Sequence, residues 1–411
     1  MEAKKTTVRD IRRRNRSILL SRLFFEGPLS RLELSGMTGL SAATASNVTA
    51  ELIDERLVVE AGQVESDGGR PRVLLRVDPD YGYVVGVELA ETGIRAELFD
   101  LSMTRRATVE EPMPPAPFDP GAVADHIAKA LAAIVPAAGV APAKVLAAGI
   151  GVPGTVDHES SAVVHAPTVG WDAVRLEQLL RDRGVELPLY VENGAKTQGQ
   201  AEMWFGSGRG ARHAVIVLVG SGVGAALVNN GAILRGISSS AGEWGHTTCV
   251  YGGRPCRCGA RGCLEAYVGA DAILDRFAEL GTGLTLDGDA DARIRAIVAA
   301  AADDPAVAAF VDEVAGMLGD GIANLVNLLN PERVVLGGFT GLALGERLLP
   351  RIRAAAQAGA LPHPFGQATI ELAKLGPDAI AFGAATLPVA DLLARGADPR
   401  ESAAAFTYVD A

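Results

Sequence analysis

One histidine and all four cysteines of the chain lie in a single glycine-rich stretch, and this cluster constrains the local fold more than any other feature. Cysteines at Cys-x-Cys and Cys-x4-Cys spacing, with a histidine upstream, can close four-coordinate nitrogen and sulfur ligation around one ion. Zn2+ is the ion that such ligands favour. The predicted ligands are His246, Cys256, Cys258 and Cys263. Cys249 falls outside this spacing, and we expect it to be a core thiol.

A disulfide pair is the alternative interpretation of these cysteines. Cys256 and Cys258 are too close in sequence for easy bridging, and the basic N-terminus lacks the apolar segment and cleavage site of a secreted protein. No segment reaches about 18 uninterrupted apolar residues, as a membrane span would require. We therefore expect a zinc site in a cytoplasmic protein that has no membrane partner.

Length and composition predict an α/β protein of two or three domains. At 411 residues the chain exceeds what one hydrophobic core usually serves. Apolar residues make up 48% of the chain and aromatic residues 5%, and 48 residues are glycine. This composition excludes disordered and fibrous proteins.

Charge is unevenly distributed. Residues 1–31 contain nine Lys or Arg residues and three acidic ones, so this arm has a charge of +6, whereas the whole chain has −11 and the remainder therefore −17. A basic arm on an acidic body favours a local site for a polyanion. A merely solvated charge run is the alternative, and the residues that follow favour the first interpretation.

The segment up to residue 55 predicts three helices. The apolar pattern from Ile11 to Phe25 is helical and ends at Gly27-Pro28. Ser30-Arg31-Leu32-Glu33 is a capping box that begins a second helix, which ends near Gly39. Leu40-Ser41 opens a third helix, Ala42 to Glu55, whose expected buried stripe is Ala45, Val48, Leu52 and Ile53. Helix, glycine turn and helix is the spacing of a helix-turn-helix motif.

The other face of the third helix predicts contact with double-stranded DNA, because its small polar side chains would let the helix enter a major groove. Leu57 to Glu60 and Val73 to Val77 are expected strands, and the loop that joins them, which bears Gly68-Gly69-Arg70-Pro71-Arg72, would form a wing with arginines at its tip. The predicted DNA-binding residues are Arg31, Ser41, Thr44, Ser46, Asn47, Arg70 and Arg72. A helix-turn-helix used only for dimerisation is the alternative.

From Tyr83 onward the chain contains motifs that are highly specific as a set. They are Gly151-Val152-Pro153-Gly154-Thr155-Val156-Asp157, Glu192-Asn193, the glycine loop from Gly220 to Gly231, Glu243-x-x-His246, the cysteine run with Glu265, and Asn330-Pro331-Glu332 leading to Gly337-Gly338. On these residues the chain resembles the ROK family (repressor, open reading frame, kinase), and the N-terminal motif resembles its repressor branch. The resemblance implies a two-lobed, actin-like or hexokinase-type α/β ATPase fold behind a winged helix-turn-helix.

The domains expected from this resemblance are a winged helix-turn-helix at 1–78, a small α/β lobe at 82–200 with about 376–394, a large α/β lobe at 201–375 and a tail at 395–411. The large lobe would contain the zinc loop and a dimerisation surface, for a homodimer or homotetramer. We expect the linker near Asp78-Pro79-Asp80 and a surface connection at the proline-rich stretch Glu111 to Pro120.

Two glycine-rich turns are candidates for a nucleotide site. Val215 to Val219 is an apolar strand that runs into Gly220-Ser221-Gly222-Val223-Gly224, where exposed backbone amides could bind a phosphate. A plain hairpin turn to the strand Ala225 to Val228 is the alternative. The resemblance implies an adenosine site at Gly337-Gly338, which follows the predicted long helix Pro305 to Leu329.

The residues needed for sugar phosphorylation are missing. In the family pattern an aspartate after Glu-Asn takes the proton of the attacking hydroxyl, and this chain has Gly194 there, with no acid in the next four residues. The family turn Asp-x-Gly-x-Thr is replaced by Glu88-Leu89-Ala90-Glu91-Thr92. Ala90 obstructs a positive-φ turn, and Glu91 places a negative charge near the phosphates. We expect no catalytic residues and no kinase activity.

The sugar-facing groups of the family are partly retained. The resemblance assigns Asn193, Glu243, His246 and Glu265 to sugar hydroxyls, with one ring nitrogen of His246 facing zinc and the other facing the ligand. Glu243 and Glu265 could instead order the zinc loop.

The sequence thus predicts a cytoplasmic, nucleoid-associated transcriptional regulator, a repressor of carbohydrate-related genes whose inactive kinase fold senses a carbohydrate effector. The alternatives are an active ROK sugar kinase with a DNA-binding arm, and a regulator controlled by a protein partner such as a phosphotransferase component.

Overall fold

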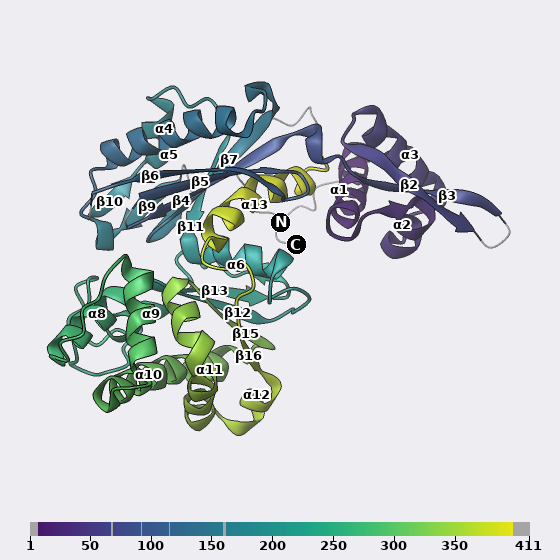
Figure 1. The fold of residues 1–411 in the computed structure, drawn as a ribbon. Helices are drawn as coiled ribbons and strands as arrows, with labels where there is room; N and C mark the ends of the chain where they lie inside the picture. Colours follow the sequence, from purple (N-terminus) through teal and green to yellow (C-terminus); the bar gives the residue numbers. More distant parts are fainter. Residues whose placement is uncertain (1–6, 67–68, 92, 115, 159–161, 398–411) are drawn as a thin grey trace.

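The computed structural model describes residues 7–66, 69–91, 93–114, 116–158 and 162–397, and it shows a winged helix beside two α/β lobes (Figure 1). Several residues named above lie outside this description. They are residues 1–6 of the basic arm, which include Lys4 and Lys5, Gly68 of the wing, Thr92, residues 398–411 of the expected tail, and the side chain of Arg70.

The winged helix contains the predicted helix-turn-helix. Its described elements are α1 (Val8–Glu26), α2 (Arg31–Thr38), α3 (Ala42–Asp54), β1 (Leu29–Ser30), β2 (Val58–Ser66) and β3 (Gly69–Val77), with the strands in the order β1-β3-β2. The Ser30 side chain accepts a hydrogen bond from the Glu33 amide, and the Glu33 carboxylate accepts one from the Ser30 amide, so the capping box is present. Gly39 ends α2 at φ 70°, a left-handed conformation that glycine adopts without strain.

The wing is longer than predicted. Antiparallel pairing continues to Val64 opposite Arg72 and Ser66 opposite Gly69, so backbone hydrogen bonding extends β3 into the segment that we expected to be a loop. Arg70 and Arg72 therefore lie in a strand, and the expectation that they lie in the loop between the strands was wrong.

The buried stripe of α3 and the basic arm also differ from the prediction. Thr49 is fully buried because its hydroxyl donates to the Ala45 carbonyl, whereas Ile53 is only half-buried.

The arm is mostly the helix α1. Arg12 and Arg16 of α1 pair with acidic residues of the α3 helix and its C-cap, and Arg16 is only 3% exposed. Arg16 is therefore a packing residue and does not contribute to a solvated basic surface.

The first lobe has a five-stranded sheet of order β11-β7-β4-β5-β6. An antiparallel meander, β4 (Tyr83–Ala90), β5 (Gly93–Asp100) and β6 (Arg105–Pro112), is joined in parallel by β7 (Val145–Val152) and β11 (Leu189–Asn193). Helices α4 (Pro120–Ala138) and α5 (Leu176–Arg181) lie on one face of this sheet and α13 (Ala379–Ala394) on the other (Figure 1). A small antiparallel sheet contains β8 (Thr155–Asp157), β9 (Val163–Ala166) and β10 (Trp171–Val174).

Helix α4 has the length and hydropathy of a membrane span, and it is the one such helix in the described part of the chain. Its residues Val123, Ile127 and Ile134 are buried in the hydrophobic core of the first lobe. Burial of this face is what a core helix requires, so its hydropathy has an explanation within the fold.

The second lobe repeats the topology of the first. Its sheet has the order β14-β13-β12-β15-β16, in which β12 (Ala214–Val219), β13 (Val223–Asn229) and β14 (Ala232–Ile233) form the meander and β15 (Arg333–Gly337) and β16 (Thr369–Leu372) add in parallel. The described helices of this lobe are α7 (Glu265–Val268), α8 (Ala270–Glu279), α9 (Ala290–Ala300), α10 (Pro305–Leu329), α11 (Phe339–Gly359) and α12 (Pro362–Gln367). Two lobes of one topology confirm the predicted fold class.

Helix α6 (Gly194–Phe205) lies between the lobes and packs on α13 and on the second sheet (Figure 1). The linker after the winged helix is an ordered 3-10 turn, Pro79–Tyr81, and the Lys144 ammonium donates to the carbonyls of Asp80 and Tyr81. The linker is therefore held against the first lobe.

Two segments expected on the surface are partly built into the fold. In the proline-rich stretch, Phe118 is buried and its carbonyl accepts a hydrogen bond from the Trp171 indole. At the start of the expected tail, Arg395 caps α13, and the carbonyls of Gly396 and Ala397 accept hydrogen bonds from Arg16. The expected tail therefore does not begin at Arg395, because these bonds order residues 395–397.

Candidate functional site

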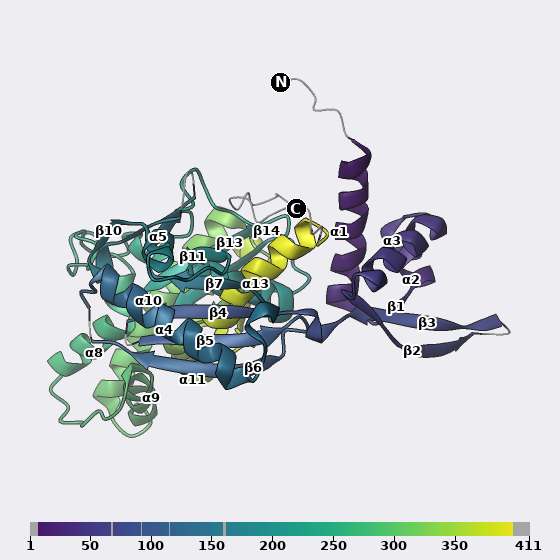
Figure 2. The ribbon, with the colours of Figure 1, turned by 90° about the horizontal axis from the view of Figure 1, so that it is seen from above.

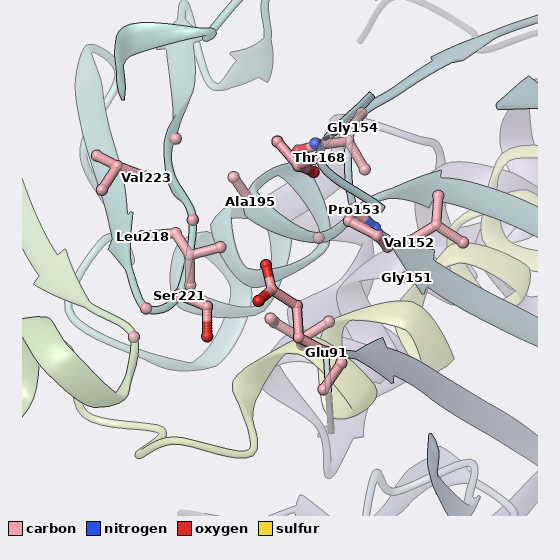
Figure 3. Close-up of a pocket in the computed structure, with 18 of the residues that line it drawn as sticks. Glu91, Gly151, Val152, Pro153, Gly154, Thr168, Ala195, Leu218, Ser221 and Val223 are labelled. Atoms are coloured by element: carbon pink, nitrogen blue, oxygen red, sulfur yellow. Dashed lines mark hydrogen bonds between the residues drawn. The ribbon is translucent and has the colours of Figure 1, made fainter. Parts of the chain in front are cut away.

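A cavity of about 370 Å³ lies between the two lobes. Figure 3 shows Gly151, Val152, Pro153 and Gly154 of the first lobe on one side, Ser221 and Val223 of the second lobe on the other, and Glu91 pointing into the space between them. The volume falls in the range of small-molecule sites, roughly 300–1,000 Å³. The four predicted effector residues, Asn193, Glu243, His246 and Glu265, all line this cavity.

The four predicted metal ligands come together beside the cavity, with their donor atoms all within 4.8 Å of one another. The sulfur atoms of Cys258 and Cys263 are 3.8 Å apart, and the Cys256 sulfur is 3.7 Å from Nδ1 of His246. Tetrahedral zinc, with bonds of about 2.0–2.3 Å, places its donors roughly 3.4–3.8 Å apart. These residues could therefore hold a metal ion such as zinc.

The metal loop achieves this geometry by folding back on itself. The amide of Cys249 donates to the Gly262 carbonyl, and the amide of Gly262 donates to the Arg254 carbonyl. Gly262 has φ 78°, and a Cβ there would lie 1.7 Å from the Val250 carbonyl oxygen, so glycine is required.

Cys249 is separate from the ligand set but is not a core thiol. It is exposed, and its sulfur donates to the Gly262 carbonyl at 3.4 Å. The prediction that it is buried was wrong, because the loop turns its side chain outward.

Burial raises the pKa of the Cys256 thiol to about 12, so a metal ion would have to displace its proton.

His246 stands between the metal ligands and the cavity. Its Nδ1 atom faces Cys256, and its Nε2 atom is 3.9 Å from a carboxylate oxygen of Glu243. Burial raises the pKa of Glu243, although the nearby charges of His246 and Lys196 oppose this. One imidazole can thus contact a metal and orient a pocket carboxylate at the same time.

Glu265 holds the site together. It is 5% exposed, one carboxylate oxygen accepts the Val223 amide at 2.9 Å, and the other lies 3.6 Å from Arg257 and 3.9 Å from the Cys256 sulfur. These contacts join the glycine turn to the metal loop. For Glu265 the geometry favours the structural alternative over direct contact with a ligand.

Asn193 and its neighbours form the start of α6. The Asn193 side chain is the N-cap of α6. Its Oδ1 atom accepts a hydrogen bond from the Lys196 backbone amide, and its Nδ2 atom donates one to the Gly154 carbonyl. A Cβ on Gly194 would lie 3.6 Å from the nearest atom of Ile380, an ordinary contact, so packing permits a Cβ atom there. Lys196 is 2% exposed, and its ammonium donates to the Ser239 carbonyl.

A cluster of charges lies behind this helix start. Burial opposes ionisation of Glu192, but His158, Arg235 and Lys196 hold its pKa down to about 2. The Arg235 guanidinium donates to the Glu192 carboxylate, which also accepts the Asn193 amide. The buried carboxylate therefore stays charged and supports the backbone at the N-cap of α6.

The glycine loop forms the hairpin turn between the antiparallel strands β12 and β13. The Gly220 amide donates a hydrogen bond to the Gly222 carbonyl, and the Val223 amide donates one to the Glu265 carboxylate. A Cβ on Gly220 would lie 3.3 Å from the ring of Phe339, which therefore packs on the turn. Two of the amides that could bind a phosphate are already used within the protein.

The sequence reasoning missed an ion pair at the first degraded loop. Glu91 and Arg257, from different lobes, approach to 2.7 Å, and the Arg257 guanidinium also donates to the Ser221 carbonyl. The position of Arg257 between two metal-ligand cysteines was the available signal. Ala90 ends strand β4 and is absent from the positive-φ residues of the described chain, so its backbone does not have the positive φ that we expected of the family turn.

Glu88 also lines the cavity, and its environment is unusual. Burial raises the pKa of Glu88 to about 7, with Asp378 and Glu97 adding to the effect and Arg95 opposing it. A carboxyl group that binds a proton near neutral pH can donate a hydrogen bond as well as accept one.

The predicted DNA-binding residues lie on the winged helix. Ser41 is the N-cap of α3, and its hydroxyl is 2.9 Å from that of Thr44, while Ser46 and Asn47 are exposed. Arg31 donates to the Thr49 hydroxyl, which anchors its guanidinium against α3. Arg72 is exposed on β3, and its charge helps to lower the pKa of Glu33, after the dominant effect of Ser30.

Comparison with known proteins identifies the family. The ROK family model matches residues 84–390. The chain belongs to the ROK family. It is 32% identical over 390 residues to the xylose repressor of Caldicellulosiruptor bescii, covering 92% of this chain and 96% of that protein.

A glucokinase and a ROK family regulator are also similar. The glucokinase of Halalkalibacterium halodurans is 39% identical over 245 residues, covering 57% of this chain and 73% of the kinase. A solved ROK family transcriptional regulator, a homologue of the Escherichia coli MLC protein, superimposes with a TM-score of 0.78 at 26% identity, covering 94% of this chain and 97% of that one. The similarity to the regulator and to the xylose repressor therefore reaches into the winged helix of this ROK protein.

Proposed function

We propose that this ROK protein is a sugar-responsive transcriptional regulator that binds double-stranded DNA and represses carbohydrate-related genes. One observation supports it above all: an exposed recognition helix is joined to a sugar-kinase fold that has Gly194 where the kinase pattern has an aspartate. The repressor and regulator relatives cover more than nine-tenths of the chain, which agrees with this proposal.

DNA binding would use α3 and the wing. Thr44, Ser46 and Asn47 would read base edges, and Arg70 and Arg72 would contact the backbone or a minor groove. Ser41 and Arg31 would position the start of α3 and the helix before it. A homodimer or homotetramer would read a pseudo-palindrome with half-sites about 10 bp, or a multiple of 10 bp, apart.

The effector would bind in the cavity between the lobes. Asn193, Glu243 and His246 would contact sugar hydroxyls, with Glu265 holding the walls together. Because relatives are named xylose repressors, xylose is the first candidate. The loss of an acceptor at residue 194 predicts weak binding, in the millimolar range.

Zinc would have a structural role. His246, Cys256, Cys258 and Cys263 would hold it, and the ion would cross-link the loop that carries Arg257 and orient His246 toward Glu243. Kinase activity is not part of the proposal, because Gly194 removes the proton acceptor, Glu91 adds a negative charge, and Phe339 covers the glycine turn. No residue is assigned a catalytic role.

The test uses the full-length chain. DNA fragments selected from a random library should converge on a pseudo-palindrome, and fluorescence anisotropy should show its affinity changing with xylose, while a coupled assay detects no ATP consumption with a panel of sugars. Selection of no sequence would reject the proposal. DNA binding that no sugar changes would instead support control by a protein partner. A cytoplasmic, nucleoid-associated location follows from DNA binding and can be checked by cell imaging.

A further inference from the structure

Two helices begin at the cavity and end at the winged helix. At one end, Gly194 and Ala195 of α6 and Ile380 of α13 line the cavity. At the other end, α6 finishes at Trp204-Phe205, and α13 is followed by the carbonyl groups that Arg16 of α1 contacts. Figure 2 shows the end of α13 beside α1. The two helices therefore span the distance between the proposed effector site and the DNA-binding domain.

These helices pack closely enough to move as one body. A Cβ on Gly383 of α13 would lie 2.0 Å from the Thr197 carbonyl oxygen of α6, so the two backbones are in direct contact. One turn further along, the side-chain amide of Gln200 in α6 donates a hydrogen bond to the Thr386 hydroxyl of α13 at 2.9 Å. Interlocked backbones of this kind transmit a displacement, because a packed interior is not easily compressed.

An aromatic cluster joins α6 to the winged helix. Phe24 and Phe25 of α1 contact Trp204 and Phe205 of α6, and Phe205 contacts Phe382 of α13. The rings of Phe25 and Trp204 meet edge to face, with centroids 4.9 Å apart. This arrangement is a favourable geometry for aromatic pairs and fixes the relative position of the two helices.

A buried arginine joins α13 to the recognition helix. The Arg16 guanidinium donates to the Gly396 carbonyl at 2.8 Å and pairs with Glu55, the C-cap residue of α3. Around it, Leu19, Leu20 and Leu23 of α1 share one hydrophobic core with Ala385, Val389 and Leu393 of α13. A shift of the end of α13 therefore acts on α1 and on the end of α3 together.

We infer that the α6–α13 pair transmits the state of the cavity to the winged helix, and that the aromatic cluster and Arg16 are the contacts through which it acts. This inference rests on the proposed function, because it requires a ligand in the cavity and DNA on α3. A ligand that displaces the cavity ends of the helices displaces their far ends as well, since the pair is rigid. The orientation of α3 then changes relative to the lobes.

The test compares Trp204→Leu with the wild type as full-length proteins. DNA affinity without sugar should stay within about threefold, and xylose binding by calorimetry should be unchanged. The change in DNA affinity caused by xylose, expected to be on the order of 5- to 150-fold in an allosteric protein, should fall toward onefold. Phe365→Leu, which alters a half-buried ring on α12 of the second lobe, is the matched control and should respond like wild type. A full xylose response in Trp204→Leu would overturn the inference.

A second measurement separates this inference from the proposed function. If the wild type binds no sugar or no DNA, the proposed function fails. The Gly194→Met variant then takes the place of a ligand, because its larger side chain perturbs the cavity end of α6. Hydrogen exchange in residues 8–26 and 42–54 should change by about threefold or more in this variant, and the change should disappear in the double variant with Trp204→Leu. Exchange that is unaffected by Gly194→Met, or affected equally in the double variant, would also overturn the inference.

Discussion

Arg257 and Glu91 form an ion pair between the two lobes, with Nη1 of the arginine 2.7 Å from Oε1 of the glutamate. Arg257 lies between Cys256 and Cys258, two of the predicted metal ligands, and Glu91 lies at the turn after β4. Burial raises the pKa of Glu91, and the charge of Arg257 opposes that effect. The pair joins the metal loop to the first lobe beside the cavity.

We expect this ion pair to stabilise the relative arrangement of the two lobes. A double-mutant cycle with Glu91→Gln and Arg257→Gln should give a coupling free energy of about 1 kcal/mol in urea unfolding, because the two side chains are 22% and 32% exposed. The pair Glu177 and Arg181, within one helix, is the control and should give about 0.3–0.5 kcal/mol. A coupling no larger than that of the control would show that the lobes do not depend on the pair.

One zinc ion should bind per chain. Mass spectrometric metal analysis of Cys258→Ser should show loss of zinc, because the substitution removes one of four donors that lie within 4.8 Å of one another. Cys249→Ser should retain zinc, since the Cys249 sulfur is exposed and bonded to a carbonyl. The opposite pattern in the two variants would move the metal site to Cys249.

Restoring an acidic residue at position 194 should improve sugar binding without restoring catalysis. A Cβ at position 194 would make only ordinary contacts with Ile380, so we expect Gly194→Asp to be tolerated, and a new acceptor for a sugar hydroxyl should add about 1 kcal/mol, or roughly fivefold, in calorimetry. Gly194→Ala, which adds no acceptor, is the control. Turnover in a coupled ATP assay should stay at background because Ala90 and Glu91 remain, and clear turnover would refute this account of the nucleotide site.

Base reading and backbone contact should be separable on the winged helix. Asn47→Ala should change the preference among DNA sites by roughly 1–3 kcal/mol, because Asn47 is exposed on the recognition helix. Arg72→Ala should weaken all sites alike and reduce the slope of binding against salt by about one ion. Anisotropy titrations at several salt concentrations measure both effects. Persistent DNA binding after deletion of residues 1–80 would contradict the assignment.

The stability of the fold should depend on the protonation of Glu88. Its pKa rises from an ordinary value of 4.5 to about 7, so the folded state binds the proton more tightly and this group destabilises the fold as the pH rises from about 4.5 to 7. Glu88→Gln should therefore be more stable than wild type by on the order of 3 kcal/mol at pH 8 and by less than about 1 kcal/mol at pH 5. Urea unfolding at the two pH values measures the difference, with Glu60→Gln on the exposed wing as the control. A gap that widens toward low pH would have the wrong sign.

Several parts of the fold were predictable from short-range chemistry. The capping box at Ser30 and Glu33 is formed by residues three positions apart, and both partners are visible in the sequence. The metal ligands lie within one loop, whose glycines permit the reversal that brings the donors together. The absence of an acid at Gly194 is likewise a property of a single position.

Other features depended on partners far away in the chain. Arg16 looks like part of a solvated basic arm, but its guanidinium contacts Glu55 and the backbone of Gly396, some 380 positions later. Cysteine is a residue type that is usually buried, yet the direction of its loop exposes the side chain of Cys249. The role of Glu265 became clear only with the Val223 amide beside it, which the meander of the second lobe brings there.

Local sequence was therefore enough for the helix-turn-helix and for the clustering of the four predicted metal ligands, because caps, ligand spacing and hydrophobic periodicity act over a few residues. The two-lobed α/β class and the missing acid at Gly194 followed from the resemblance of the sequence motifs to the ROK family. Packing between distant segments decided the Glu91–Arg257 contact, the environment of Glu88 and the route from the cavity to α1. Those features depend on how two sheets and two helices meet, and the sequence around one residue of such a contact does not identify its distant partner.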